Sequence, residues 1–172
     1  SMSLRYQNGE LILAETRGNG IVGEDVTLNS KVISDVKERI EISDEYLEVR
    51  GEVYMTHKDF ERINEKQEML NKKPFANPRN CAAGTLRQLD PEVTKERGLR
   101  FFVFNVQDGS RALMERHTVG LDYLAEKGIT VVPHILCRTA EEVLQAIDKI
   151  GENRGQYLYD IDGAVVKIEQ TE

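Results

Sequence analysis

The sequence opens with a tight-turn dipeptide, Asn8-Gly9, between two alternating segments, Leu4–Gln7 and Glu10–Glu15. Both turn residues tolerate the positive φ that a two-residue hairpin loop requires, so the flanking segments are predicted to be antiparallel strands. Further strands are expected at Tyr46–Met55, Arg100–Val106, Ile129–Leu136 and Gly163–Ile168. The hairpin favours antiparallel pairing, and we expect an α+β fold with antiparallel sheets and flanking helices instead of a doubly wound parallel sheet.

Four helices are predicted from capping residues and apolar spacing. Thr56 and Asp59 form the start of one, with Phe60, Ile63 and Leu70 as its buried stripe. The others are expected at residues 78–88, from Ser110 to Lys127 with Gly128 as the stop, and from Thr139 to about Ile150.

The length of 172 residues fits one domain, and the 40% apolar fraction is enough for a core. Ser1-Met2 resembles a cloning remnant, and neither a signal peptide nor an apolar run of roughly 20 residues is visible. Two cysteines, Cys81 and Cys137, are too few for a disulfide framework or a cysteine-based zinc site. We therefore expect a cytoplasmic protein.

The net charge of −7 is unevenly distributed. Residues 62–100 carry nine basic and five acidic residues, whereas 1–61 carry seven and 13, and 101–172 carry seven and 12. The basic middle could face phosphates, or it could be a solvated face of mixed charge.

A glycine-rich segment, Thr16–Gly20, contains Arg17 and is followed by Gly23-Glu24-Asp25. Glycines let backbone N–H groups approach an anion, and an arginine can add a bidentate phosphate contact. The sequence matches neither GxGxxG in a βαβ unit nor a P-loop, and a glycine-rich loop taken alone is more often an ordinary turn.

Strand alternation puts Glu48, Arg50 and Glu52 on one face, and Gly51 is expected to leave space for a close approach. This pattern is typical of a cross-strand ladder of ion pairs. It also fits a carboxylate on a rigid strand that holds a ribose hydroxyl or a metal-bound water.

The helix expected at 78–88 begins with Asn77 as N-cap and Pro78 in its first turn. Arg79 and Arg87 are eight residues apart, near one helix face, and the small residues between them permit close backbone packing. Together with Lys72-Lys73 the arginines suit phosphate binding, although two exposed arginines can also have no function.

Lys167 lies in the apolar segment that follows Asp160-Ile161-Asp162-Gly163. A lysine in an apolar strand needs an anion, because burial of an ammonium without a partner is costly. A ligand phosphate and an ordinary buried ion pair are both possible partners.

In this order, these segments resemble the adenylation (nucleotidyltransferase) domain of bacterial NAD-dependent DNA ligases. The strings that carry the resemblance are Ala14–Thr27, Leu47–Met55, Lys73–Pro91, Phe101–Val106 and Asp160–Lys167. The resemblance implies the nucleotidyltransferase fold of DNA ligases and mRNA capping enzymes. It also implies a reaction in which a lysine takes AMP from NAD, AMP passes to the 5′-phosphate of nicked double-stranded DNA, and the strand is sealed during replication and repair, with Mg²⁺ neutralising phosphate charge.

The resemblance also implies residue roles. Glu52 would hold the AMP ribose or a metal-associated water, Phe104 would stack on adenine, and Lys167, with Asp162 and Gly163 in its motif, would lie against the adenylate. Four arginines would contact phosphates of the nucleotide or of DNA: Arg17, Arg79, Arg87 and Arg154.

The nucleophilic lysine of this family lies in a Lys-x-Asp-Gly motif, which occurs nowhere in the 172 residues. We therefore expect residues 3–172 to be a partial adenylation domain, truncated after that motif and unable to adenylate itself. The parent chain would add an N-terminal domain for nicotinamide mononucleotide and C-terminal OB, zinc, helix-hairpin-helix and BRCT domains.

Two other functions remain open from the sequence. The first is a non-catalytic nucleotide- or DNA-binding module. The second, with less support, is a metal-dependent hydrolase that uses Glu24, Asp25, Asp160 and Asp162, which lack histidine partners.

Overall fold

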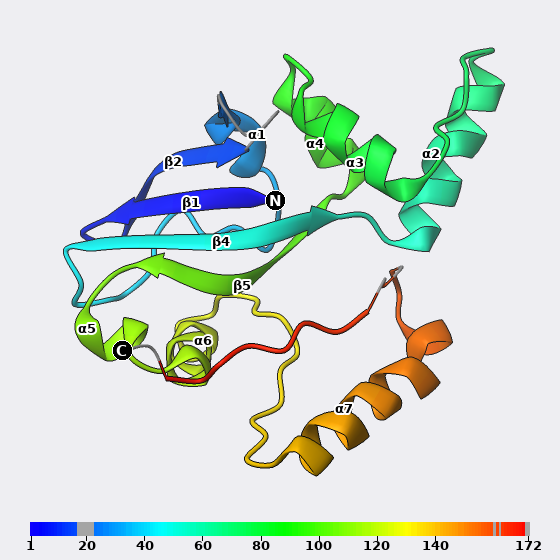
Figure 1. The fold of residues 1–172 in the computed structure, drawn as a ribbon. Helices are drawn as coiled ribbons and strands as arrows, with labels where there is room; N and C mark the ends of the chain where they lie inside the picture. Colours follow the sequence, from blue (N-terminus) through cyan, green and yellow to red (C-terminus); the bar gives the residue numbers. More distant parts are fainter. Residues whose placement is uncertain (17–22, 160, 162, 171–172) are drawn as a thin grey trace.

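The computed structural model describes residues 1–16, 23–159, 161 and 163–170. Its centre is a five-stranded antiparallel sheet in the order β3-β2-β1-β4-β5 (Figure 1). The strands are β1 (Met2–Gln7), β2 (Glu10–Thr16), β3 (Glu24–Asp25), β4 (Tyr46–Tyr54) and β5 (Arg100–Asp108). The helices are α1 (Thr27–Ser30), α2 (His57–Met69), α3 (Pro78–Leu86), α4 (Pro91–Arg97), α5 (Arg111–Met114), α6 (His117–Glu126) and α7 (Ala140–Glu152), followed by the 3₁₀ turn η1 (Arg154–Gln156). The α+β class and the antiparallel pairing are confirmed.

The opening hairpin forms as predicted. Asn8 and Gly9 have φ values of 50° and 81° and join β1 to β2. Alternate side chains of the sheet are buried on one face, among them Leu4, Val49 and Phe101. This face forms the core against which α5 and α6 pack.

Three of the four predicted helix starts are confirmed by side-chain caps. The Asp59 N–H donates to Thr56 Oγ1 at 3.2 Å at the start of α2. Asn77 and Thr139 cap α3 and α7 in the same way. The buried stripe on α2 is wrong at Leu70, which follows the last helical residue and is 53% exposed.

The helix predicted from Ser110 to Lys127 is broken into α5 and α6. A Cβ on Gly120 would lie 2.6 Å from the Leu113 carbonyl oxygen, so α6 packs directly on the chain of α5. Leu113 on α5 and Leu121 on α6 are both buried in the core. Gly128, at φ 87°, follows the end of α6 as predicted.

The two late strands are not formed. At Ile129–Leu136 the contact with β5 is a single parallel bridge, in which the Val103 N–H donates to the Thr130 carbonyl and the Val132 N–H to the Val103 carbonyl. Gly163–Ile168 is extended but belongs to no ladder among the described residues. Val165, Val166 and Ile168 are 81%, 63% and 85% exposed, so the described residues offer these side chains little cover.

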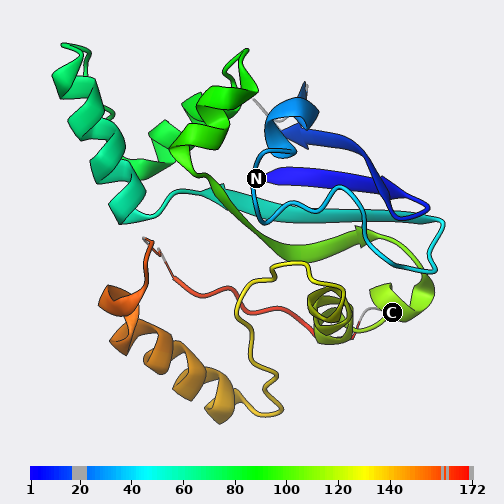
Figure 2. The ribbon, with the colours of Figure 1, turned by 180° about the vertical axis from the view of Figure 1, so that it is seen from behind.

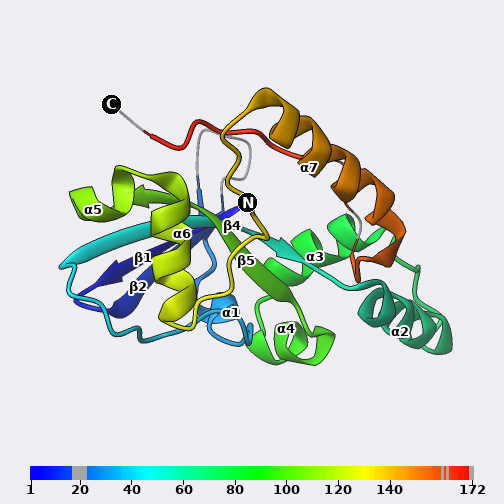
Figure 3. The same ribbon diagram turned by 90° about the horizontal axis from the view of Figure 1, so that it is seen from below.

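The figures show how the helices are grouped. In Figure 1, α2, α3 and α4 lie beyond one end of the sheet, and α6 lies below β5, where it is seen nearly end-on. Figure 2 shows the same grouping from behind, and Figure 3 shows α7 set apart from the sheet, beside the C-terminal segment. None of the described helices has the length and apolarity needed to cross a membrane.

Candidate functional site

A pocket of about 350 Å³ lies where α3 meets the ends of β2 and β4, and we name it the α3 pocket. It brings together three of the predicted site residues, Glu52, Arg79 and Arg87, from two separate elements. Its lining is completed by Ser1, Thr16, Val26, Val53, Ala82, Ala83 and Leu86. The pocket thus combines a carboxylate, two guanidinium groups and an apolar floor.

Glu52 lies on β4, on the strand face that it shares with Glu48 and Arg50, as the alternation in the sequence predicts. Its side chain is 44% exposed, and its Oε2 lies 3.6 Å from the α-amino nitrogen of Ser1. The expectation that Gly51 leaves space for a close approach is confirmed, and what approaches is β5. A Cβ there would lie 2.1 Å from the Phe102 carbonyl oxygen, so a side chain at this position would block that approach.

The other two charged residues of this β4 face have different partners. Arg5 Nε on β1 lies 3.4 Å from Glu48 Oε1, so the ladder interpretation holds for Glu48. Arg50 donates to Ser1 Oγ at 3.2 Å. Of the three, only Glu52 lines the α3 pocket.

Helix α3 carries Arg79, and Arg87 is its C-cap. Cys81 and Ala82 are buried against the rest of the protein, whereas a Cβ at Gly84 would meet nothing within 4 Å. The close packing therefore comes from the first half of the small-residue run only. Arg79 and Arg87 are both exposed, and Arg87 Nε lies 3.5 Å from Glu24 Oε2 on β3.

Several basic residues between positions 62 and 100 form ion pairs or cation–π contacts within the protein. Lys66 pairs with Glu96, and Arg100 Nε lies 2.7 Å from Asp35 Oδ2. Arg97 lies over the Phe75 ring, 5.0 Å from its centroid. Part of the positive charge is therefore neutralised in ion pairs, while Arg79 and Arg87 line the α3 pocket.

Lys167 and Phe104 form a second site. Lys167 Nζ lies 5.2 Å from the Phe104 ring centroid, a cation–π contact, and partial burial lowers the pKa of Lys167. An aromatic ring thus takes the place of the predicted anionic partner. Phe104 has no partner on β4, because the register shifts there from Arg50↔Asn105 to Gly51↔Val103.

A pocket of about 430 Å³, the Lys167 pocket, adjoins this contact. Its lining consists of Asn105, Val106, Gln107, Leu113, Met114, His117, Lys167 and Ile168. It shares no lining residue with the α3 pocket. The structure therefore groups the predicted site residues into two sets.

Glu169 fixes the chain beside Lys167, a role that the sequence reasoning missed. Its carboxylate accepts from the Thr118 N–H at 3.0 Å and from the Thr118 hydroxyl at 2.6 Å, and its carbonyl accepts from the His117 N–H. Burial and the nearby Lys167 ammonium lower the pKa of His117. A contact over 51 residues has no local sequence signal.

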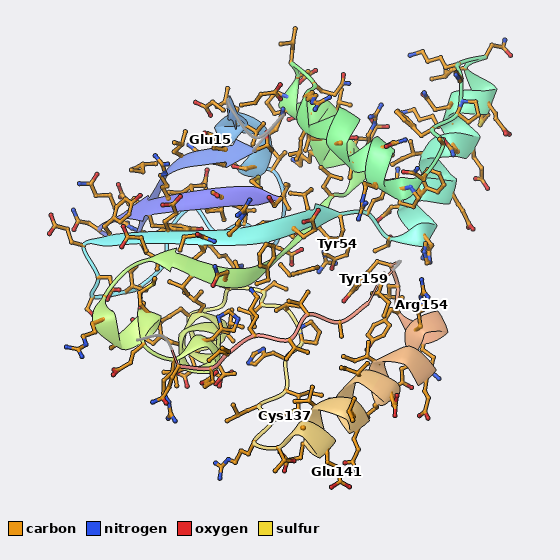
Figure 4. All side chains as sticks on the ribbon, viewed as in Figure 1. Glu15, Tyr54, Cys137, Glu141, Arg154 and Tyr159 are labelled. Atoms are coloured by element: carbon orange, nitrogen blue, oxygen red, sulfur yellow. The ribbon has the colours of Figure 1, made fainter. Side chains whose placement is uncertain are left out.

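The remaining predicted residues stand apart or lie outside the described residues. Arg154 is exposed on η1 and lines neither pocket. Figure 4 shows it beyond Tyr159, whose ring packs against Tyr54 with centroids 4.7 Å apart. Arg17 and Asp162 lie outside the described residues, as does Asp160.

Acidic side chains do not gather into a metal site within the described part of the chain, where no group of three His, Cys, Asp or Glu residues could hold an ion. Asp25 accepts from the Thr27 hydroxyl at 2.6 Å and from its N–H at 2.9 Å, which lowers the pKa of that carboxyl. It therefore stabilises the turn into α1, and the hydrolase hypothesis gains no support from it.

The comparisons with known proteins agree with one another. A family model described as NAD-dependent DNA ligase adenylation domain matches residues 1–172. A DNA ligase from Acetivibrio thermocellus is 47% identical over 173 residues, which cover 100% of this chain and 26% of that protein. DNA ligases from Clostridium kluyveri and Dinoroseobacter shibae are each 46% identical, over 96% and 98% of this chain and 25% and 23% of theirs. The chain spans about a quarter of the length of the curated relatives it matches.

Proposed function

The chain belongs to the NAD-dependent DNA ligase adenylation domain family, and we propose that it is the part of such a ligase that binds the adenylate and the phosphates of a DNA nick. The whole enzyme would adenylate itself with NAD, transfer AMP to the 5′-phosphate of nicked DNA and seal the strand. The observation that carries this proposal is the meeting of Glu52, Arg79 and Arg87 in one pocket.

We propose that the α3 pocket binds the ribose and phosphates. Glu52 would accept hydrogen bonds from the ribose hydroxyls, since a carboxylate has only acceptors to offer. Arg79 and Arg87 would bind phosphate oxygens in the planar, bidentate way that guanidinium groups favour. Arg17 and Arg154 would add phosphate contacts to the nucleotide and to DNA.

At the Lys167 pocket, we propose that Phe104 stacks on adenine and that Lys167 moves from the ring to the adenylate, with Asp162 in its motif. A cation–π contact is worth about 0.5–1 kcal/mol at an exposed site, less than a charge-assisted hydrogen bond to phosphate. An incoming nucleotide would therefore displace Lys167 from Phe104 at little cost.

Mg²⁺ prefers one or two carboxylates together with substrate phosphates to a cage built from protein alone. Glu52 fits that requirement as a single carboxylate beside the arginines. Bound there with the nucleotide, the ion would neutralise phosphate charge.

Because the 172 residues contain no Lys-x-Asp-Gly motif, we propose that the chain alone forms no covalent adenylate. The remaining domains of a ligase, and the role in DNA replication and repair in the cytoplasm, would belong to the parent protein. Incubation with NAD and Mg²⁺ should give no AMP-labelled chain, and labelling would contradict this part of the proposal.

A chimaera tests the proposal as a whole. In the chimaera, the 172 residues of this chain replace the matching segment of the Acetivibrio thermocellus ligase, to which they are 47% identical. The chimaera should adenylate itself and seal nicks, whereas Arg79→Ala and Arg87→Ala should slow sealing and Arg39→Ala should not. Arg39 is the matched control because it is exposed and pairs with Glu10, outside the α3 pocket.

A folded chimaera that fails to adenylate would contradict the proposal. If it still bound nicked DNA, the outcome would favour a non-catalytic binding module.

A further inference from the structure

Asn29, on α1, is a buried polar residue that no part of the proposed mechanism uses. It is 8% exposed, and its Nδ2 donates to the carbonyl oxygens of Leu86 and Gln88, both at 2.7 Å. These two carbonyls lie on either side of Arg87. Because a carbonyl can only accept, the two N–H groups of the amide must both face them, which fixes the orientation of the side chain.

The two bonds close the end of α3. Arg87 is the C-cap of this helix, with φ −89° and ψ −1°, and the last carbonyls of a helix have no partner within it. Asn29 supplies that partner from 57 residues away in the sequence. The backbone at Arg87 is thus held by α1 as well as by its own helix.

The amide oxygen of Asn29 has a partner as well. The Thr94 hydroxyl lies 3.2 Å from Asn29 Oδ1 and 3.1 Å from the Thr85 carbonyl oxygen. Arg97 Nη1 donates to Thr85 Oγ1 at 2.9 Å. Thr85 and Thr94 are fully buried, so this network is shielded from water and its bonds gain strength.

The segment that carries Asn29 is itself tied to the sheet. The Ala14 N–H on β2 donates to Thr27 Oγ1 at 3.0 Å, and Asp25 accepts from Thr27. β2 ends at Thr16, which lines the α3 pocket. The same segment provides Glu24, whose carboxylate lies beside the Arg87 guanidinium.

We propose that Asn29 is a positioning residue for Arg87. It fixes the backbone on both sides of the arginine relative to β2, so that the guanidinium enters the α3 pocket at a set place. The inference rests on the proposed function in one respect, that Arg87 binds a phosphate of the nucleotide or of the DNA nick.

The first test measures the backbone and requires no ligand. In the 172-residue chain, the NMR order parameter of the Arg87 amide should be about 0.85, and Asn29→Ala should lower it toward about 0.6. Asn64→Ala is the matched control, because Asn64 makes a similar pair of amide bonds to Phe75 at 3.1 and 2.8 Å, away from the pocket. It should leave the Arg87 value unchanged.

Thr94→Val provides a second variant if Asn29→Ala does not fold. It keeps Asn29 in place but removes the hydroxyl next to its oxygen, so the order parameter of Arg87 should fall by a smaller amount. An unchanged order parameter in whichever of the two variants folds would overturn the proposal, whether or not the chain binds a nucleotide.

The second test is a double-mutant cycle in the chimaera, with a nicked duplex that carries a 5′-phosphate. Asn29→Ala should weaken binding about tenfold, and in the Arg87→Ala background its effect should fall below about twofold. A purely structural role would lower the melting temperature in both backgrounds and weaken binding equally in both, which would overturn the proposal. Failure of the unsubstituted chimaera to bind the duplex would instead contradict the proposed function and leave the NMR test to decide on Asn29.

Discussion

The α3 pocket and the C-terminal region after α6 position their residues in different ways. Glu52, Arg79 and Arg87 stand on a strand and a helix whose opposite faces are buried in the core. In the C-terminal region, α7 has no buried residue, and Val165 and Val166 are 81% and 63% exposed. The core therefore places the first set of site residues, whereas Lys167 depends on the Phe104 ring and on the Glu169 contact with α6.

The largest effect on the free energy of unfolding is expected from a substitution in the packed core. Phe101 on β5 is 1% exposed, and its ring lies so close to Gly51 that a Cβ there would be 2.4 Å from Phe101 Cζ. Phe101→Ala should lower the free energy of unfolding by about 3–5 kcal/mol, because it removes a large buried side chain and leaves a cavity. Urea unfolding measures the effect, and a loss below about 1 kcal/mol would show that this part of the core is not packed as described.

A smaller effect on stability is expected at Asp35, which connects β5 to Thr130 in the C-terminal region. Its carboxylate accepts from Arg100, from the Phe101 N–H and from the Thr130 hydroxyl. Partial burial acts to raise the pKa of Asp35, but these hydrogen bonds and the charge of Arg100 hold it below its ordinary value.

A carboxyl with a lowered folded-state pKa stabilises the protein above its unfolded pKa of about 3.9, and that stability is lost as the pH falls further toward the folded value. Asp35→Asn should therefore destabilise the chain at pH 6 by about 1–3 kcal/mol and by less at pH 3. Urea unfolding at both pH values measures this, and an equal loss at the two would exclude the proposed role of the ionised carboxylate.

The smallest expected effect is in the C-terminal region. Val166→Ala should change the free energy of unfolding by less than about 0.5 kcal/mol, since the side chain is already mostly in water. Measured in the same urea series as Phe101→Ala, a loss of 2 kcal/mol or more, roughly that of a buried valine, would show that the region is packed.

The parts of the fold that were predicted have local signals. Asn77 and Pro78 start α3, and Asn8-Gly9 forms the hairpin, because capping and turn geometry depend on adjacent residues. Helix α4 was not predicted, although it has similar local signals in its N-cap Asp90 and in Gly98 at φ 70°.

The parts that were missed depend on distant contacts. The break between α5 and α6 accompanies the packing of Gly120 on the Leu113 carbonyl, and Gly51, predicted to allow a close approach, receives β5 there. The site residues likewise divide into those placed by local spacing and those placed by distant contacts. Strand and helix spacing put Glu52 and the α3 arginines on suitable faces, whereas the position of Lys167 follows from Glu169 and α6.

The central claim is that Glu52 acts on the nucleotide from the α3 pocket, and a comparison with Glu48 tests it most directly. Both glutamates lie on the same face of β4, but Glu48 pairs with Arg5 and lies outside the pocket lining. In the chimaera, Glu52→Gln should slow single-turnover self-adenylation on the order of 100-fold. Glu48→Gln should change the rate by less than about twofold, because Glu48 lies outside the pocket and pairs with Arg5 instead. Equal effects of the two substitutions would contradict the account.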